Sequence, residues 1–497
     1  MSQHYPVLLV TVPLLSAFLI SISGWLNKRL CFPIAVAALA SASFFSAGLL
    51  SKVIHKNVVL YRLGGWAPPW GIAYRVDYLN GLVLVVVSLV ALINLISTYR
   101  SVEREFSEKL GAFYTLYVLF VTGLLGITVT GDAFNLYVLL EIASLTGYGL
   151  IAMGEEDRAP LASLNYVYMG TIGACFYLLG IGYLYIVTGS LNMADISAIL
   201  PSLYQSRAVL SAFIICMVGV WLKMAFFPLH AWLPNAYTFA PSAASSLIAP
   251  LMTKVMVYVM LRLMLTVFTP DFVFSAIDIN RSIVWLAVIA ISMGAILALT
   301  ARNLKKMLTY IIVAEVGYMV GGAWLGNRAG MTGAILHLVN DALMTLCVFL
   351  VVGNIVYRMK GHSFEDLRGL FRKMPFTMGA FAIGALSIIG VPPTCGFFSK
   401  WYLLWGGIQA GHYAFVAALL FSSLVNVVLF FRIFEIGYYE SPTEAHGGGH
   451  SQGSIEEAPL SMLVPLYLVA VGLVVVGLYT GAIVNNVIRL AVPPGIV

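Results

Sequence analysis

Long apolar stretches alternate with short polar segments along almost the whole chain. Each stretch holds about 20 residues, enough for one helix to cross a hydrocarbon core of roughly 30 Å. Windowed hydropathy predicts about fourteen spanning helices, over residues 6–25, 31–51, 79–98, 112–130, 132–153, 161–188, 208–227, 243–266, 282–300, 304–325, 329–357, 376–408, 412–436 and 460–487. The pattern therefore predicts an all-α polytopic membrane protein.

Composition agrees with this fold class. Of 497 residues, 61% are apolar and 10% are charged, whereas soluble domains have about 25% charged residues. Loops after odd-numbered spans hold most of the basic residues, among them Lys28, Arg29, Arg100, Arg104, Arg302, Lys305, Lys306, Arg368, Arg372 and Lys373. By the positive-inside rule these loops face the cytoplasm, so we expect a plasma-membrane protein with both termini on the outer side. The net charge of +6 reflects this asymmetry and does not indicate nucleic-acid binding.

Two predicted spans contain prolines close to a lysine. In "GVWLKMAFFPLHAWLPNA" (219–236) Lys223 precedes Pro228, and in "GVPPTCGFFSKWYLL" (390–404) Lys400 follows Pro392 and Pro393. Proline frees backbone carbonyls, which a bilayer tolerates only where protein or water satisfies them. Broken helices of this kind often line ion pathways. We therefore expect spans 7 and 12 to be broken near a functional lysine.

The spacing of the two broken spans predicts an internal repeat. They lie five spans apart, so residues 112–266 and 282–436 form two five-helix repeats. Because each repeat has an odd number of spans, we expect the two to be inverted relative to each other. Helices 1–3 (1–111) precede the repeats, and a polar loop with helix 14 (437–497) follows them.

Several ionisable residues fall within the predicted spans. A charge at mid-bilayer costs at least about 2.5–3.5 kcal/mol, so each one requires a partner or a water-filled cavity. The residues are Glu141, Lys223, Lys254, Glu315, His337, Asp341 and Lys400. Lysine beside a carboxylate, and histidine in most settings, can gain and lose a proton near neutral pH. The set therefore predicts a proton relay through the membrane.

The chain shows no nucleotide, haem or hydrolytic motif. We expect no catalytic centre, cofactor or metal in it, and any redox cofactor would belong to a partner subunit. The five cysteines have no metal-type spacing and are predicted to be small buried apolar residues: Cys31, Cys175, Cys216, Cys347 and Cys395. The polar stretch 439–458 is predicted to be a solvated linker, with His446 and His450 as the weaker metal-ligand alternative.

Three segments carry a resemblance to a known family: "GDAFNLYVLLEIASLTGYGL" (131–150), "LKMAFFPLHAWLPNAYTFAPSAASSLIAPLMTKVMVY" (222–258) and "DLRGLFRKMPFTMGAFAIGALSIIGVPPTCGFFSKW" (366–401). They resemble the antiporter-like membrane subunit superfamily, which includes large membrane subunits of complex I, of membrane-bound hydrogenases and of Mrp multi-subunit cation/proton antiporters. "YRLGGWAPPWGIAYRVDYLNG" (61–81) and "LTYIIVAEVGYM" (308–319) look most like the D-type member of the Mrp branch.

The resemblance implies roles for individual residues. Glu141 matches the family's helix-5 glutamate, which pairs with the broken-helix lysine, here Lys223. Lys254 matches the lysine that continues the hydrated axis, and Lys400 matches the terminal proton exchanger. The residues expected to shape the two breaks are Pro228, His230, Trp232, Pro392 and Pro393.

One segment departs from the family pattern. The family's helix 11 usually carries a histidine, a second polar residue and a lysine one turn apart. In "HLVNDALMTLCVF" (337–349) His337 is kept, but Asp341 and Thr345 follow it. We predict that Asp341 shares a helix face with His337 and pairs with His337 or Lys254; a mere subunit contact is the alternative.

The favoured function is proton translocation within an Mrp-type antiporter that exchanges Na+ or K+ for protons. The alternatives are a proton-pumping subunit of a complex I-like NADH-quinone oxidoreductase or membrane-bound hydrogenase, and a non-conducting scaffold subunit of such a complex. A stand-alone carrier of an organic substrate is the weakest interpretation. Expected partners are other membrane subunits, protons and the lipid bilayer.

Overall fold

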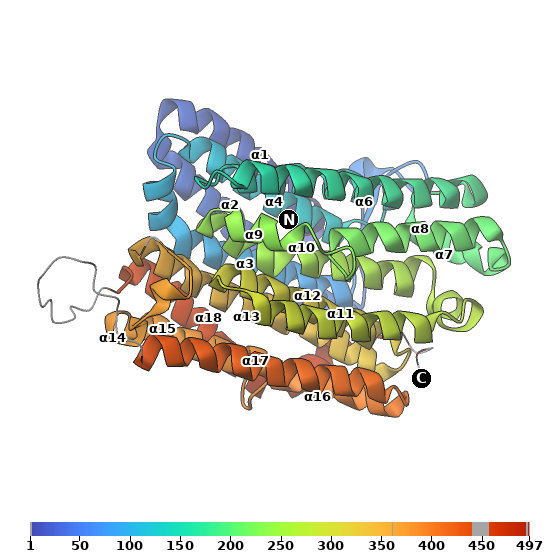
Figure 1. The fold of residues 1–497 in the computed structure, drawn as a ribbon. Coiled ribbons are helices and arrows are strands. Elements are labelled where there is room, and N and C mark those ends of the chain that lie inside the picture. The colour runs from blue at the N-terminus through green and yellow to red at the C-terminus, as the bar shows by residue number, and fades with distance from the viewer. Residues whose placement is uncertain (1, 360, 440–456, 494–495, 497) are drawn as a thin grey trace, which may run out of the picture.

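The computed structural model describes residues 2–359, 361–439, 457–493 and 496, which form a bundle of apolar helices lying side by side (Figure 1). The helices are α1 (Tyr5–Leu26), α2 (Cys31–Lys56), α3 (Tyr78–Glu105), α4 (Leu110–Val129), α5 (Ala133–Ala152), α6 (Ala159–Thr188), α7 (Met193–Ile199), α8 (Arg207–Lys223), α9 (Leu233–Phe239), α10 (Ser242–Arg262), α11 (Asn280–Thr300), α12 (Leu304–Trp324), α13 (Arg328–Met359), α14 (Leu370–Lys373), α15 (Pro375–Ile389), α16 (Cys395–Gln409), α17 (Tyr413–Tyr439), α18 (Leu460–Leu478), α19 (Thr480–Ile483) and α20 (Arg489–Ala491). Short 3-10 turns lie at Ser2–His4, Lys28–Leu30, Leu63–Gly65, Leu200–Leu203 and Glu365–Leu367, and π-helical turns at Leu263–Val267, Phe272–Ala276 and Val484–Ile488.

The predicted all-α membrane fold is confirmed. Among the described residues, 12 helices are long and apolar enough to cross a membrane. The predicted spans 7 and 12 are not among these helices, because each is divided in two: α8 with α9, and α15 with α16. The total of fourteen spans and the inverted relation of the two repeats stay predictions, as does the division of the chain into domains.

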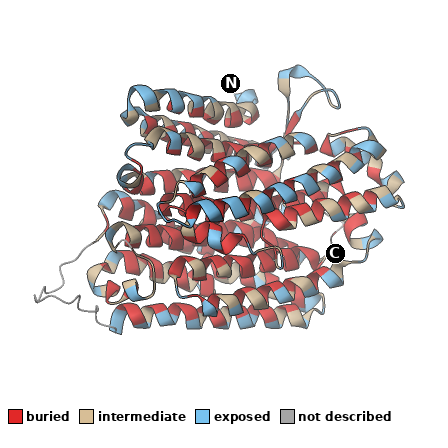
Figure 2. Cartoon of the chain, turned by 45° about the horizontal axis from the view of Figure 1, so that its top comes forward, coloured by how far each residue is buried: buried red, intermediate tan, exposed pale blue. Residues whose placement is uncertain are grey.

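The most buried helices lie in the middle of the bundle (Figure 2). In its most apolar window α10 is 100% buried, and α12 and α13 are each 94% buried, whereas α1 is only 28% buried. Peripheral helices expose large apolar side chains, as expected where lipid is the solvent. The three central helices also carry Lys254, Glu315, His337 and Asp341, so these ionisable groups are placed where lipid cannot reach them.

Both predicted breaks are present. Helix α8 ends at Lys223, and the chain then passes through Ala225, whose φ is +58°, and Pro228 before α9 begins. Helix α15 ends at Ile389, and the next residue is Gly390 with φ +95°. Glycine adopts this left-handed conformation without a steric penalty. A Cβ at Gly390 would lie 3.1 Å from the Cδ of Lys400, so the glycine also leaves room for that lysine.

A two-stranded hairpin covers one end of the bundle. Strands β1 (Val59–Arg62) and β2 (Ala73–Val76) are antiparallel, with Val59 opposite Val76 and Arg62 opposite Ala73. Directly after β2, Asp77 caps the N-terminus of α3 by accepting hydrogen bonds from the backbone N–H groups of Leu79 and Asn80. The hairpin therefore fixes where α3 starts.

The cysteine prediction is wrong at one position. Cys175 is exposed on α6, whereas the other four cysteines are buried. The side chain lies on a peripheral helix whose outer face is apolar, and a small apolar thiol suits lipid as well as a protein core. The residues His446 and His450 lie outside the described residues.

Candidate functional site

Lys223 lies at the C-terminal end of α8 and is almost completely buried, with 1% of its side chain exposed. Its Nζ lies 3.7 Å from Oε1 of Glu141 on α5. The ammonium also donates to Oγ of Ser144 at 2.6 Å and to the hydroxyl of Tyr148 at 3.5 Å. These three partners lie on one face of α5 because they are three and four residues apart. The structure thus brings together the Glu141 carboxylate and the Lys223 ammonium, the two groups that were predicted to pair.

Glu141 is less enclosed than its partner. Its side chain is 25% exposed, and it lies on the same stripe of α5 as the exposed Phe134, Val138 and Leu145. A carboxylate on an outward-facing apolar stripe within a membrane is expensive without further cover. The pair with Lys223 supplies part of that cover.

The break after α8 is stabilised by an aromatic residue. Trp232 donates its indole N–H at 3.1 Å to the carbonyl of Leu222 in the last turn of α8. This carbonyl also accepts from the backbone N–H of Ala225 at 3.2 Å, just beyond the helix. The ring stacks on Tyr166 with centroids 4.0 Å apart and an interplanar angle of 2°. His230 lies against Phe227, and its Nδ1 has no hydrogen-bond partner among the described residues. Trp232 thus contacts the broken end of α8, and the carbonyl of His230 accepts from the backbone N–H of Leu233 at 3.0 Å, at the start of α9.

Lys254 on α10 forms the second buried pair. Its Nζ lies 3.0 Å from Oδ2 of Asp341 on α13, and the exposed fractions of the two side chains are 2% and 0%. The ammonium also donates to Oγ1 of Thr345 and to the carbonyl of Ala249, each at 3.3 Å. Thr345 in turn donates to Oδ1 of Asp341 at 2.8 Å. Of the two partners predicted for Asp341, the structure therefore places Lys254 at ion-pair distance.

Glu315 on α12 is buried beside this pair. Its side chain is 1% exposed, and its electrostatic neighbours are Asp341, Lys254 and Lys400. This carboxyl group therefore interacts with both the middle and the last lysine. The sequence pattern left its role open between helix packing and proton transfer.

Lys400 lies on α16 and meets the backbone as well as a side chain. Its Nζ donates to the carbonyl oxygens of Ile388 at 2.7 Å and Ile389 at 3.2 Å, and to Oγ of Ser423 at 2.9 Å. The two carbonyls are at the C-terminal end of α15, where the helix dipole is negative and the groups have no intrahelical donors. The lysine therefore caps the helix that the break ends.

His337 and Tyr318 connect Lys400 to the centre. Nδ1 of His337 lies 2.9 Å from Oγ of Ser399, the residue before Lys400. The ring of Tyr318 lies 5.3 Å from that of His337, and the Lys400 ammonium lies 5.3 Å from the centroid of the same tyrosine ring. Neither Tyr318 nor Ser399 stood out in the sequence as a candidate functional residue. The adjacent pair Ser-Lys in "FFSKW" was the only available signal.

A polar cavity of about 550 Å3 lies at the end of the bundle opposite the hairpin. Its lining includes Glu105, Lys305, His362 and Asp366. Lys305 is buried and donates to the carbonyl of Ala240 at 2.9 Å. Burial and the nearby Lys305 lower the pKa of His362 to about 4. Polar groups from segments far apart in the sequence meet in this cavity. Their spacing along the chain could not predict that they lie together.

A metal site in a protein needs several ligating side chains close together. Within the parts of the chain that the structure describes, no group of three or more His, Cys, Asp or Glu side chains is arranged to hold a metal ion. The buried charges interact instead with one another and with hydroxyl and carbonyl groups.

A bundle of membrane-spanning helices with a line of buried charges beside two broken helices is the architecture of transport proteins. The chain belongs to the NADH:quinone oxidoreductase/Mrp antiporter transmembrane family, whose sequence model matches residues 130–426. The family resemblance predicted from the sequence motifs is thereby confirmed.

Individual relatives come from both branches of this family. The chain is 40% identical to NADH-quinone oxidoreductase subunit N of Desulforudis audaxviator over 99% of both chains. It is 29% identical to the D-type subunit of the Na+/H+ antiporter of Bacillus subtilis over 93% of both chains. Its fold matches a chain in the structure of the Mrp complex from Dietzia sp. with a TM-score of 0.88, at 23% identity, over 99% of this chain and 97% of that one.

Proposed function

We propose that this chain carries protons through the membrane as one subunit of a multi-subunit cation/proton antiporter of the Mrp type. The observation that carries the proposal is the set of buried amines with matched partners. Lys223 meets Glu141, Lys254 meets Asp341, and Lys400 meets the end of α15. A buried amine is useful for proton transfer when its partner can stabilise the charged form and release it again.

The relay runs from Glu141 and Lys223 to Lys254, and then by way of His337 to Lys400. Asp341 and Glu315 supply the negative charge in its middle. Hydroxyl groups that are buried and have no hydrogen-bond partner among the described residues include those of Tyr237 on α9 and Thr253 on α10. Helix α9 connects the two helices that carry Lys223 and Lys254. Such groups are typical positions for bound water, which would complete the connection.

The topology follows from the basic loops. We place the end of the bundle that holds Lys305 and His362 in the cytoplasm and the hairpin end outside the plasma membrane. Both termini are then external. The cavity lined by Glu105, Lys305 and His362 gives water access to the bundle from the cytoplasmic side.

A second candidate is a proton-pumping subunit of a complex I-like enzyme. The 40% identity to a protein named NADH-quinone oxidoreductase subunit N favours it. Both candidates use the same proton path and differ in what drives it. In the second, the electrons would pass through partner subunits, because this sequence has no cofactor motif.

Reconstitution of the native complex in vesicles with a trapped pH dye tests the path and separates the two candidates. We expect an imposed Na+ or K+ gradient to drive proton movement, and Lys223→Met to abolish it. Lys56→Met, which removes an exposed lysine at the end of α2, is the matched control and leaves transport unchanged. Proton movement that requires NADH and quinone instead of a cation gradient would assign the chain to the redox complex. Full transport in the assembled Lys223→Met complex would refute the path itself.

A further inference from the structure

A polar ladder continues from Lys254 along α10 toward the hairpin end of the bundle. Tyr258 and Arg262 follow Lys254 at intervals of four residues, so all three share one face of the helix. Tyr258 has none of its surface exposed, and Arg262 has 5% exposed. The Nε of Arg262 donates to the Tyr258 hydroxyl at 3.1 Å, and that hydroxyl donates to the carbonyl of Thr128 at 2.9 Å. None of these contacts belongs to the relay described above.

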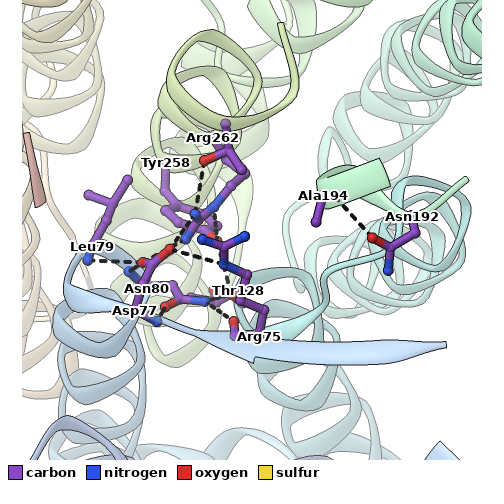
Figure 3. A network of polar contacts seen from close by, with 10 residues as sticks. Arg75, Asp77, Leu79, Asn80, Thr128, Asn192, Ala194, Tyr258 and Arg262 are labelled. Carbon is purple, nitrogen blue, oxygen red and sulfur yellow. Dashed lines mark hydrogen bonds and ion pairs between the residues drawn. The ribbon is translucent and has the colours of Figure 1, made fainter. Parts of the chain in front are cut away.

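The ladder ends at a rigidly held ion pair. Nη1 and Nη2 of Arg262 donate to the two carboxylate oxygens of Asp77 at 2.6 and 2.9 Å (Figure 3). Asp77 is itself fixed because it caps α3. The side chain of Asn80 ties the same corner together by donating to the carbonyls of Arg75 and Thr128. Burial alone would raise the pKa of Asp77, but the Arg262 guanidinium lowers it below its ordinary value.

This pair borders a cavity on the hairpin side of the bundle. A cavity of about 550 Å3 is lined by Arg75, Asp77, Arg262 and Thr266, with residues 490–493 on another wall. Asp77 is 18% exposed and Arg262 is 6% exposed in their side chains. The pair is therefore the boundary between an accessible polar cavity and the buried part of the ladder.

The charges at this boundary do not cancel. Nε of Arg75 lies 4.0 Å from the same Asp77 carboxylate, so two guanidinium groups face one carboxylate and leave a net charge of about +1. Arginine stays protonated in proteins. A fixed positive charge in a narrow polar passage repels protons, which is how some channels exclude them.

We infer that Arg262, held by Asp77, is a proton barrier that separates the hairpin-side cavity from Lys254. A relay that was open to this cavity through Tyr258 would let protons cross without coupling to cation exchange. The inference rests on the proposed function, because a leak matters only where Lys254 belongs to a proton path. Arg262 acts through the passage and not by receiving the transported proton.

The test measures passive proton leak in vesicles that hold the whole complex, with a pH gradient and no cation gradient. Arg262→Gln should raise the leak about tenfold, which corresponds to a barrier lowered by about 1.4 kcal/mol. Arg262→Lys keeps the charge and should stay tight. Adding Tyr258→Phe to Arg262→Gln removes the hydroxyl step and should close the leak again. A leak caused by misfolding would persist in that double variant, and persistence overturns the proposal.

Arg75→Gln provides the same test without breaking the buried pair, in case Arg262→Gln prevents assembly. It removes the excess positive charge and should raise the leak by a smaller factor. Wild-type tightness in Arg75→Gln and in assembled Arg262→Gln refutes the barrier. The proposed function is tested by a different measurement, the loss of cation-driven proton transport in Lys223→Met. A negative result in the leak assay therefore refutes the barrier and leaves the proposed function untouched.

Discussion

The Lys254–Asp341 pair provides a quantitative test of the buried charges. Asp341→Asn keeps the size of the side chain and removes the charge that lies at ion-pair distance from Lys254. The ammonium keeps its hydrogen bonds to Thr345 and to the Ala249 carbonyl, and the more distant charge of Glu315. Breaking one side of a buried pair typically costs about 3–5 kcal/mol. Both side chains are at most 2% exposed, so bulk solvent does not screen the charge that remains. We expect Asp341→Asn and Lys254→Met each to lower the free energy of unfolding by an amount in this range.

The double variant decides whether the interaction itself is responsible. Lys254→Met with Asp341→Asn removes both charges of the pair. The double variant should therefore lose about 2–3 kcal/mol less free energy of unfolding than the sum of the two single variants. Unfolding in detergent mixtures of rising SDS content, followed by tryptophan fluorescence, measures all four proteins of the cycle. The double variant should regain stability and still fail to transport protons.

A surface pair serves as the matched control for this cycle. Nζ of Lys28 lies 2.9 Å from Oε2 of Glu108, nearly the same separation, but the side chains are 40% and 86% exposed. Exposed pairs contribute little because water screens them. If the cycle at Lys254 and Asp341 gives no more coupling than the cycle at Lys28 and Glu108, burial does not strengthen the pair.

Three further outcomes are expected. Glu141→Gln should slow cation-driven proton exchange by about tenfold, the factor for roughly 1.4 kcal/mol of lost stabilisation, and an unchanged rate would remove Glu141 from the path. In the folded protein the pKa of His362 is about 4, below the ordinary value of roughly 6.5, so the wild type loses stability as the pH falls from 6.5 to 4. The melting temperature of His362→Gln should therefore vary less than that of the wild type over this pH range. Trp232→Phe keeps the stack on Tyr166 and loses the hydrogen bond to Leu222, so unfolding measurements should show a loss of about 0.5–1.5 kcal/mol; a neutral result would show that the bond is dispensable.

Hydropathy and proline positions predicted much of the architecture. Spans of apolar residues are local signals, and so are the prolines that break two of them at Pro228 and at Pro392 and Pro393. The pairing of Glu141 with Lys223 was also accessible, because the resemblance supplied both residues.

Other contacts could not be predicted from the sequence. The partners of Lys400 include backbone carbonyls, which have no sequence signature because every residue has one. Asp77 and Arg262 are 185 positions apart, and only the packing of α3 against α10 brings them together. Glu315 was identified as buried, but its proximity to Lys254 and Lys400 depends on how α12 packs against α10 and α16.

The two broken helices hold their lysines in chemically different ways. The partner of Lys223 is a carboxylate, which loses its charge when it takes up a proton, so chemistry alone can weaken that attachment. The carbonyls of Ile388 and Ile389 that hold Lys400 cannot be titrated. These bonds weaken when Lys400 itself gives up its proton or when α16 shifts relative to the end of α15. In the first half a proton can therefore act on either member of the pair, whereas in the second it can act only on the lysine.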